Sequence, residues 1–266
     1  MPPTEPTTET TTKPNIAADA VKYAMPIILA IETSSELASC ALLSGATLLS
    51  RASSGVRTHS QAILPMVQDL LAEAGIALRD CDAIAFGAGP GSFTGVRTAC
   101  GIAQGLAFGA GLPVVPVVTL AAMALACHQH TGATEVLAVL DARMGEVYWA
   151  QYRYAGLWQE LVAPTLCAPS EVVPVVSMPP MVSPAPLAAC GNGFSAYPHA
   201  FSGCDFGATA LAQVMPHASA VAQLALIELA AGRSVAPARA QPLYLRNKIA
   251  FTSAERLVIN AAKVAA

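Results

Sequence analysis

The residues that could carry chemistry gather in one glycine-rich stretch, GAGPGSFTGVRTACGIAQG, which runs from Gly87 to Gly105. An apolar strand, a glycine turn and a helix start would leave free N–H groups and a positive dipole end, which can hold an anion. The spacing is not GxGxxG, because Ser92 stands at the third glycine, and no GK[ST] follows. Two interpretations stay open: a phosphate loop of another class at Gly89, Gly91 and Ser92, or glycines needed for close packing.

Acidic residues offer a second candidate chemistry at two strand ends. Glu32 closes the first apolar strand, where its carboxylate could help to hold Mg-ATP or could be a solvated or capping residue. Asp141 and Glu146 flank the turn in DARMGE and could act as a carboxylate pair, although a hairpin turn exposes such residues anyway.

The histidines and cysteines do not form a known metal or nucleophile motif. Ile63 stands four residues after His59, so neither HExxH nor HxxxH occurs. The seven cysteines include no CxxC pair, and the chain has no GxSxG elbow. We therefore expect reduced thiols, no bound metal and no self-sufficient catalytic centre.

Composition narrows the class of protein further. Fourteen basic and 17 acidic side chains give a net charge of −3, which argues against a broad nucleic-acid footprint. Residues 98–134 carry no charged side chain, but glycines and prolines cut them into pieces shorter than the roughly 20 residues that a membrane span needs. The Thr- and Pro-rich start lacks the apolar core of a signal peptide. We expect a cytoplasmic protein without membrane contact.

Hydrophobic periodicity predicts two halves with the same order of elements, three strands and then helix, strand and helix. The first half has strands at 26–34, 38–45, 46–53 and 81–89, an extended segment at 112–120, and helices at 59–75, after Gly91 and after 120. The second half has strands at 136–143, 146–154, 157–168 and 187–193 and a helix at 218–233.

This duplication predicts an α/β fold of the actin/hexokinase/Hsp70 type, with two related domains that each hold a mixed five-stranded sheet and helices. We place the N-terminal domain at 25–118 and the C-terminal domain at 119–250, with the helix at 218–233 able to pack back on the first domain. Segments 1–24 and 251–266 are predicted to be disordered or flexible tails. The stretch that begins QPLYLRN could form an arm on or between the domains.

The helix after the glycine turn carries Gly101, Gly105 and Gly109 on one face. A face of glycines lets another helix backbone approach closely. Arg97 and Gln104 keep this helix soluble, so the facing helix would belong either to this fold or to another chain.

Five motifs follow one another across about residues 26–250: ILAIETSSELASCALL, HSQAILPMVQDLL, GAGPGSFTGVRTACGIAQGLAFG, VLAVLDARMGEVYWAQY and PLYLRN. Together they resemble the TsaB (YeaZ) family of bacterial proteins, and GPGSFTGVR and DARMGEVYWA are the most specific of them. The resemblance implies the actin-like fold and a part in making N6-threonylcarbamoyladenosine next to the anticodon of tRNA.

The resemblance also implies that the chain is a non-catalytic scaffold. It would bind and activate TsaD, the paralogue that transfers the threonylcarbamoyl group, and the ATPase TsaE would join them. ATP would be used by these partners, so no cofactor is expected here, and tRNA would be met only within the complex. TsaD carries an HxxxH metal pair, and Ile63 fits a partner that has lost it.

The implied interface is a bundle of the first two helices, at about 59–74 and 94–108, which a homodimer would share in competition with the heterodimer. The residues assigned to this interface are His59, Ile63, Leu64, Val67, Leu71, Arg97, Gly101, Gln104, Gly105 and Phe108.

Glu32, Gly89, Gly91 and Ser92 would then be a vestigial phosphate or nucleotide loop, which leaves room for a weak nucleotide site. Glu32 stands where many relatives have Asp, and the extra methylene would move a Mg²⁺ ligand by about 1.5 Å. Two alternatives remain: an autonomous actin-fold ATPase or kinase, and a protease, which would need a metal or nucleophile site.

Overall fold

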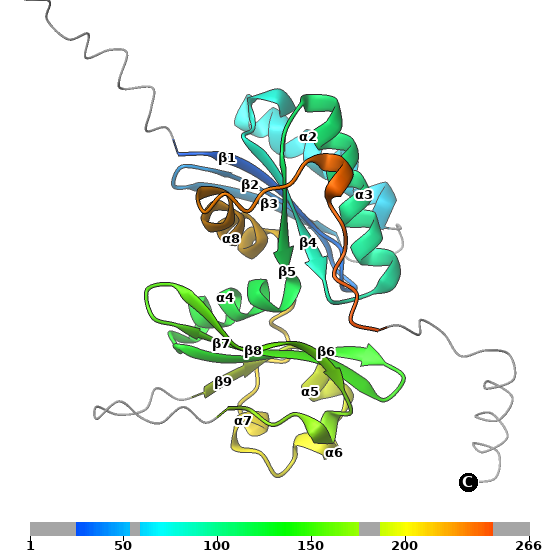
Figure 1. Cartoon of the computed structure of the whole chain (residues 1–266), viewed down its shortest axis with the longest axis vertical. Coiled ribbons are helices and arrows are strands. Elements are labelled where there is room, and N and C mark those ends of the chain that lie inside the picture. The colour runs from blue at the N-terminus through cyan, green and yellow to red at the C-terminus, as the bar shows by residue number, and fades with distance from the viewer. Residues whose placement is uncertain (1–24, 54–58, 176–186, 247–266) are drawn as a thin grey trace, which may run out of the picture.

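The computed structural model describes residues 25–53, 59–175 and 187–246 as two lobes, each built on one β-sheet (Figure 1). The predicted tails at 1–24 and 251–266 lie outside the described residues.

The first sheet has five strands in the order β3-β2-β1-β4-β5. The first three strands are antiparallel neighbours, whereas β4 runs parallel to β1 and β5 runs parallel to β4, so both are reached through helices. Gly45 makes the turn from β2 to β3 with a φ of 58°. The strands are β1 (Ile27–Glu32), β2 (Ala38–Ser44), β3 (Thr47–Ser53), β4 (Ala83–Gly89) and β5 (Val114–Val118).

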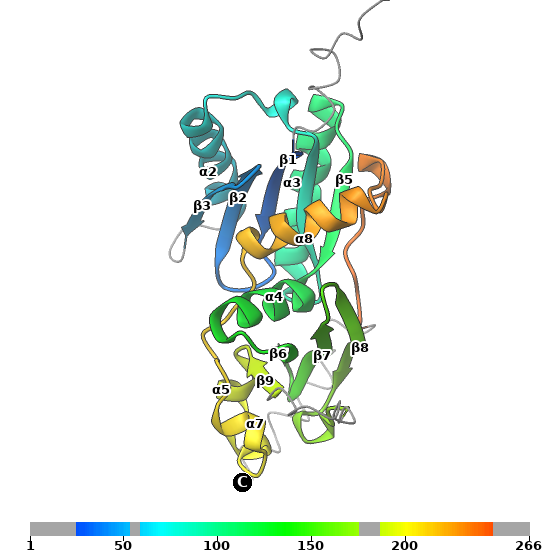
Figure 2. The same ribbon diagram turned by 90° about the vertical axis from the view of Figure 1, so that its left-hand side faces the viewer.

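Helices cover both faces of this sheet (Figure 2). α2 (His59–Ala74) and α3 (Phe93–Ala110) pack on one face, and α8 (Ala218–Ala230) packs on the other. Successive residues of a strand point to opposite faces, so Ile31 packs toward α2 and α3 while Ile28 packs toward α8. This explains why β1 is apolar at nearly every position.

Local signals fix both ends of α3. Ser92 is its N-cap, since the Ser92 side chain accepts a hydrogen bond from the Gly95 N–H at 3.4 Å. Gly111 ends the helix in the left-handed conformation, with a φ of 70°. The helix therefore starts at the glycine-rich loop.

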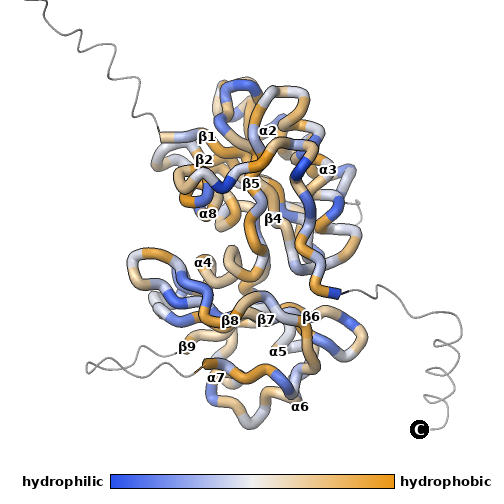
Figure 3. Tube along the Cα trace, viewed as in Figure 1, coloured by the Kyte–Doolittle hydropathy of each residue, from blue (hydrophilic) through white to orange (hydrophobic). Residues whose placement is uncertain are grey.

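The second sheet repeats this pattern in the order β8-β7-β6-β9, with β9 parallel to β6. α4 (Thr119–Thr131) lies between the sheets and contributes to the cores on both of its sides. Hydrophobic colours accordingly mark β5 and α4 in the middle of the molecule (Figure 3). The strands are β6 (Glu135–Arg143), β7 (Glu146–Tyr154), β8 (Trp158–Cys167) and β9 (Leu187–Cys190).

The repeated sheet order confirms the predicted actin-like α/β fold, with one correction. The sequence predicts five strands in each sheet, but the second sheet has four among the described residues. Leu211 forms an isolated parallel bridge with Cys190 at the place of the fifth strand. The chain turns directly after Leu211 and reaches Pro216, which has no N–H to donate, so a longer strand does not form.

Three four-residue helices in the second lobe are not predicted from the sequence, because they are too short for a 3.6-residue period. Phe194 and Phe201 anchor two of them on the second sheet. No helix in the described ranges is long and apolar enough to span a membrane. The short elements are α5 (Gly193–Ala196), α6 (Pro198–Phe201), α7 (Asp205–Ala208) and the 3-10 turns η2 (Leu78–Asp80), η3 (Pro169–Glu171) and η4 (Pro237–Arg239).

Candidate functional site

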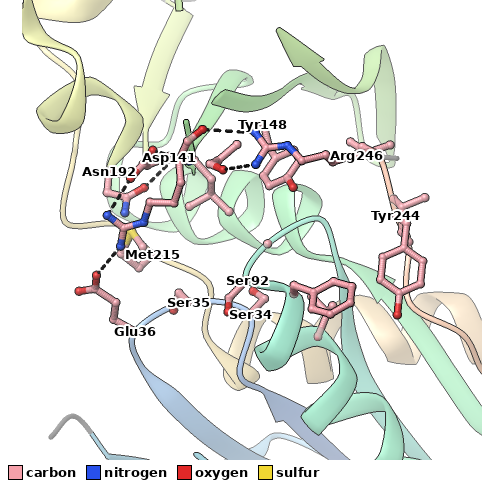
Figure 4. Close-up of a pocket in the computed structure, with 18 of the residues that line it drawn as sticks. Ser34, Ser35, Glu36, Ser92, Asp141, Tyr148, Asn192, Met215, Tyr244 and Arg246 are labelled. Carbon is pink, nitrogen blue, oxygen red and sulfur yellow. Dashed lines mark hydrogen bonds and ion pairs between the residues drawn. The ribbon is translucent and has the colours of Figure 1, made fainter. Parts of the chain in front are cut away.

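A cavity of about 700 Å³ lies between the two lobes. The β1–β2 loop and the start of α3 line it from the first lobe, and the β6–β7 hairpin lines it from the second. Residues 243–246 run along its edge from one lobe to the other. Figure 4 places Ser34 and Ser92 on one side of the cavity and Asp141 and Asn192 on the other.

The glycine-rich loop packs tightly against the β1–β2 loop. A Cβ at Gly91 would lie 2.7 Å from the carbonyl oxygen of Ser34, and a Cβ at Gly95 would lie 1.9 Å from that of Thr33. The Ser92 N–H donates to the Ser34 carbonyl at 2.7 Å, so this donor is already used within the chain. Close packing is enough to explain these glycines. The phosphate-loop interpretation stays a prediction.

Glu32 is fully buried behind this loop and does not line the cavity. Its Oε1 accepts the Ser34 N–H at 2.5 Å, while Oε2 has no hydrogen-bond partner among the described residues. A Cβ at Gly87 would lie 1.8 Å from Oε2, so the absent side chain makes room for the carboxyl. Burial raises the pKa of Glu32, which favours the neutral acid. An enclosed carboxyl of this kind is poorly placed to hold a metal ion in the cavity.

The β6–β7 hairpin presents charged groups at the cavity. Arg143 and Met144 both have a positive φ, 62° and 61°, which is a strained conformation for residues with a Cβ. The Arg143 guanidinium lies 3.2 Å from Asp141 and 3.0 Å from Glu36 of the β1–β2 loop. Because two carboxylates surround this guanidinium, it offers little net charge to an anionic ligand.

Residues 240–246 form the arm that the sequence suggests, and this arm lies between the lobes. The Leu243 N–H donates to the carbonyl of Ala88 at the end of β4, in the first lobe. Arg246 donates to the carbonyl of Ala142 in the second lobe at 3.0 Å. The arm therefore joins the lobes beside the cavity.

The residues predicted to form a partner interface divide into exposed and buried groups. Phe108 is 82% exposed and Leu64 is 45% exposed. A Cβ at Gly101 or Gly105 would meet nothing within 4 Å, and Arg97 is exposed on the same side of the helix. We call Arg97, Gly101, Gly105 and Phe108 the α3 face.

The structure corrects the prediction for Ile63 and Val67. They are 0% and 3% exposed and lie in the core between α2 and the first sheet, so they are not available to a partner. Apolar residues on α2 mark the side that packs on the sheet, so the apolar pattern alone does not separate core residues from partner-facing ones. Leu71 and Gln104 are half-buried, and Gln104 donates to the Ala240 carbonyl at 2.9 Å.

His59 lies at the start of α2, where it lines the cavity. Its Nε2 is 3.3 Å from the carbonyl oxygen of Glu36. In the part of the chain that the structure describes, no group of three His, Cys, Asp or Glu side chains is arranged to hold a metal ion.

Tyr148, Asn192 and Tyr244 are among the cavity residues that the sequence does not identify. The Asn192 side chain accepts the Asp141 N–H at 2.9 Å and so joins the end of β9 to β6. Asn192 follows a strand in CGNG, and Tyr244 lies in PLYLRN. Both residues therefore belong to motifs that could have marked them as candidates for a functional site. Their meeting at one cavity depends on contacts between distant parts of the chain.

Comparisons with known proteins agree over most of the chain. The family model described as TsaD, tRNA N6-adenosine threonylcarbamoyltransferase, matches residues 46–264. The tRNA threonylcarbamoyladenosine biosynthesis protein TsaB of Escherichia coli is 40% identical over 226 residues, which cover 84% of this chain and 96% of that protein. The protein of the same name from Haemophilus influenzae is 36% identical over 233 residues, which cover 84% and 95%.

Solved structures show the same likeness. YeaZ from Pseudomonas aeruginosa aligns with a TM-score of 0.73 at 40% identity, over 83% of this chain and 100% of that chain. A second Pseudomonas aeruginosa structure, described as an uncharacterized protein with similarity to peptidase YEAZ, aligns with a TM-score of 0.74 at 41% identity, over 84% and 100%.

Proposed function

The chain belongs to the TsaB family of tRNA threonylcarbamoyladenosine biosynthesis proteins, and from this we propose that it is a non-catalytic scaffold subunit of the complex that makes N6-threonylcarbamoyladenosine in tRNA. In this proposal a TsaD-type partner transfers the threonylcarbamoyl group, this chain binds and activates that partner, and a TsaE-type ATPase joins them. The complex works in the cytoplasm, and tRNA contacts this chain only within the complex.

The α3 face is the observation that carries this proposal. Each glycine lowers the stability of a helix by about 1 kcal/mol relative to alanine. No contact with the other described residues explains Gly101 and Gly105, because a Cβ at either position would meet none of their atoms within 4 Å. A helix of another chain that approaches the α3 backbone closely would explain them, and Phe108 would then be covered by that partner.

A second copy of this chain can use the same face. Two α3 helices could then pack against each other, and the homodimer would compete with the complex that contains the TsaD-type subunit. Raising the concentration of this chain alone should therefore favour the homodimer.

Binding of Mg-ATP is a second candidate function, which the cavity and the start of α3 favour. The burial of Glu32 and the use of the Ser92 N–H within the chain weigh against it. Calorimetric titration of the isolated chain with Mg-ATP tests it directly, and binding at millimolar affinity or better would support it.

The decisive assay measures threonylcarbamoyl transfer to tRNA from threonylcarbamoyl-AMP. It compares this chain alone, the TsaD-type subunit alone, both together, and both with the TsaE-type ATPase. The proposal expects transfer only when this chain and the TsaD-type subunit are mixed. Transfer or ATP turnover by this chain alone would contradict it.

Gly105→Leu tests the location of the interface. The added side chain fills the space over the α3 backbone, so we expect loss of the complex and of transfer while the chain stays folded. Gly203→Leu is the matched control, because Gly203 also faces open space but lies in the second lobe. Equal binding by both variants would exclude the α3 face as the interface.

A further inference from the structure

The arm formed by residues 240–246, called the strap from here on, contacts the first lobe along α3. The carbonyl of Ala240 accepts hydrogen bonds from the side chains of Gln104, at 2.9 Å, and Cys100. The Arg97 Nε donates to the Tyr244 hydroxyl at 2.8 Å. Arg97 belongs to the α3 face, so the strap touches the surface proposed for the partner.

The other end of the strap holds the strained hairpin of the second lobe. Arg246 is mostly buried, with 13% of its side chain exposed. It donates to the carbonyls of Ala142 at 3.0 Å and Arg143 at 3.3 Å, and it forms an ion pair with Glu146. These bonds satisfy backbone acceptors on both sides of the turn, so Arg246 stabilises the conformation in which Arg143 and Met144 have positive φ.

The hairpin in turn reaches back to the first lobe through the contact between Arg143 and Glu36. The contacts therefore run from Arg97 through Tyr244 and Arg246 to Arg143 and Glu36. Figure 4 shows Tyr244, Arg246 and Glu36 around the same cavity.

From these contacts we infer that the strap couples the α3 face to the cavity. A helix that docks on Arg97 and Tyr244 then sets how firmly the two lobes close over the cavity. The docking step rests on the proposed function. The coupling itself is a property of the free chain and can be measured there.

The first experiment is a double-mutant cycle in the isolated chain, read by hydrogen exchange of the backbone amides at 141–148. Arg246→Lys removes the paired donors at the hairpin, and we expect exchange to rise about tenfold. Tyr244→Phe removes only the hydroxyl bonded to Arg97. We expect it to raise exchange at the distant hairpin about threefold in the native chain and not at all in the Arg246→Lys chain.

The control is Thr98→Ala, on the same helix, where the lost hydroxyl donates to the Thr94 carbonyl of the same helix at 3.0 Å. It should leave exchange at the hairpin unchanged. The inference is overturned if Tyr244→Phe has no effect at the hairpin, or if it has the same effect in both backgrounds.

The second experiment uses a second copy of this chain as the docked partner and raises the protein concentration. Assembly should protect the hairpin amides in the native chain but not in Tyr244→Phe. Equal protection in both chains would overturn the coupling. Failure of both chains to assemble would contradict the proposed interface, and the double-mutant cycle would still decide the coupling.

Discussion

Two groups of glycines lie a few residues apart in the same stretch and have opposite surroundings. At Gly87, Gly91 and Gly95 a Cβ would lie 1.8–2.7 Å from a neighbouring atom of the chain. At Gly101 and Gly105 a Cβ would meet nothing within 4 Å. Contacts inside the chain require the first group, whereas nothing among the described residues requires the second.

This difference teaches how to interpret a glycine-rich motif. The first group serves the fold, because Gly87 makes room for the Glu32 carboxyl and Gly91 and Gly95 let the start of α3 pack on the β1–β2 loop. The second group weakens a helix without a compensating contact in the described ranges, so we assign its role to another molecule. Four changes test this contrast.

Gly95→Ala should have the largest effect. The new Cβ would lie 1.9 Å from a backbone oxygen of Thr33, which cannot move without separating α3 from the β1–β2 loop. We expect the free energy of unfolding to fall by about 3 kcal/mol or more, measured by denaturant unfolding. A loss below about 1 kcal/mol would show that this packing is adjustable.

Phe108→Ser should come next, with an effect on assembly and not on folding. Phe108 is largely exposed, so its loss should change stability by less than about 0.5 kcal/mol. Affinity for the TsaD-type subunit should fall about tenfold or more, measured by surface plasmon resonance. Leu157→Ser is the control, since Leu157 is 66% exposed on the second lobe. A similar loss of affinity in this variant would mean that the α3 face is not the specific binding surface.

Gly101→Ala should change the free energy of unfolding in the opposite direction to Gly95→Ala. The methyl group meets open space, so the free chain should gain about 1 kcal/mol of stability from helix propensity. The same unfolding assay measures this change. A destabilised variant would mean that Gly101 serves the fold after all.

Glu32→Gln should give the smallest effect, since the glutamine keeps the shape and the Oε1 acceptor. Burial raises the pKa of Glu32 above its ordinary value of 4.5, so the folded chain binds this proton more tightly than the unfolded chain. The resulting stability is present below pH 4.5 and is lost as the pH rises through the raised pKa. The free energy of unfolding of the Glu32→Gln variant should therefore rise relative to that of the native chain as pH rises. Unfolding curves measured from pH 4.5 to 8 test this. A difference in unfolding free energy between the two proteins that stays constant with pH would mean that Glu32 is not buried as the neutral acid.

Much of the fold follows from local patterns in the sequence. The short apolar runs of the strands, bounded by turn residues, and the helical spacing of apolar residues in α2 and α8 predict their type and approximate bounds. The four-residue helices near Phe194 and Phe201 escape prediction, because they contain barely one turn and depend on packing against the second sheet.

The candidate site is less accessible from the sequence. The apolar pattern of α2 does not say which residues face the sheet and which face a partner, and Ile63 and Val67 prove to be buried against the sheet. The cavity is built from segments more than a hundred residues apart, such as Glu36 and Arg143, and no local signal predicts that pairing. Arg246 is a further example, since its acceptors lie in the β6–β7 hairpin.

The position of α8 has a consequence for the order in which the protein can be made. α8 covers one apolar face of the first sheet, and its first N–H, at Ala218, donates to the Ser39 hydroxyl in β2 at 3.0 Å. A ribosome that has finished β5 must therefore add about a hundred residues before this cover exists, which takes roughly 10 s at about 10 residues per second. Until then the face of the first sheet that carries Ile28 lacks α8, so we expect the first lobe to complete its packing only after the second lobe has been synthesised.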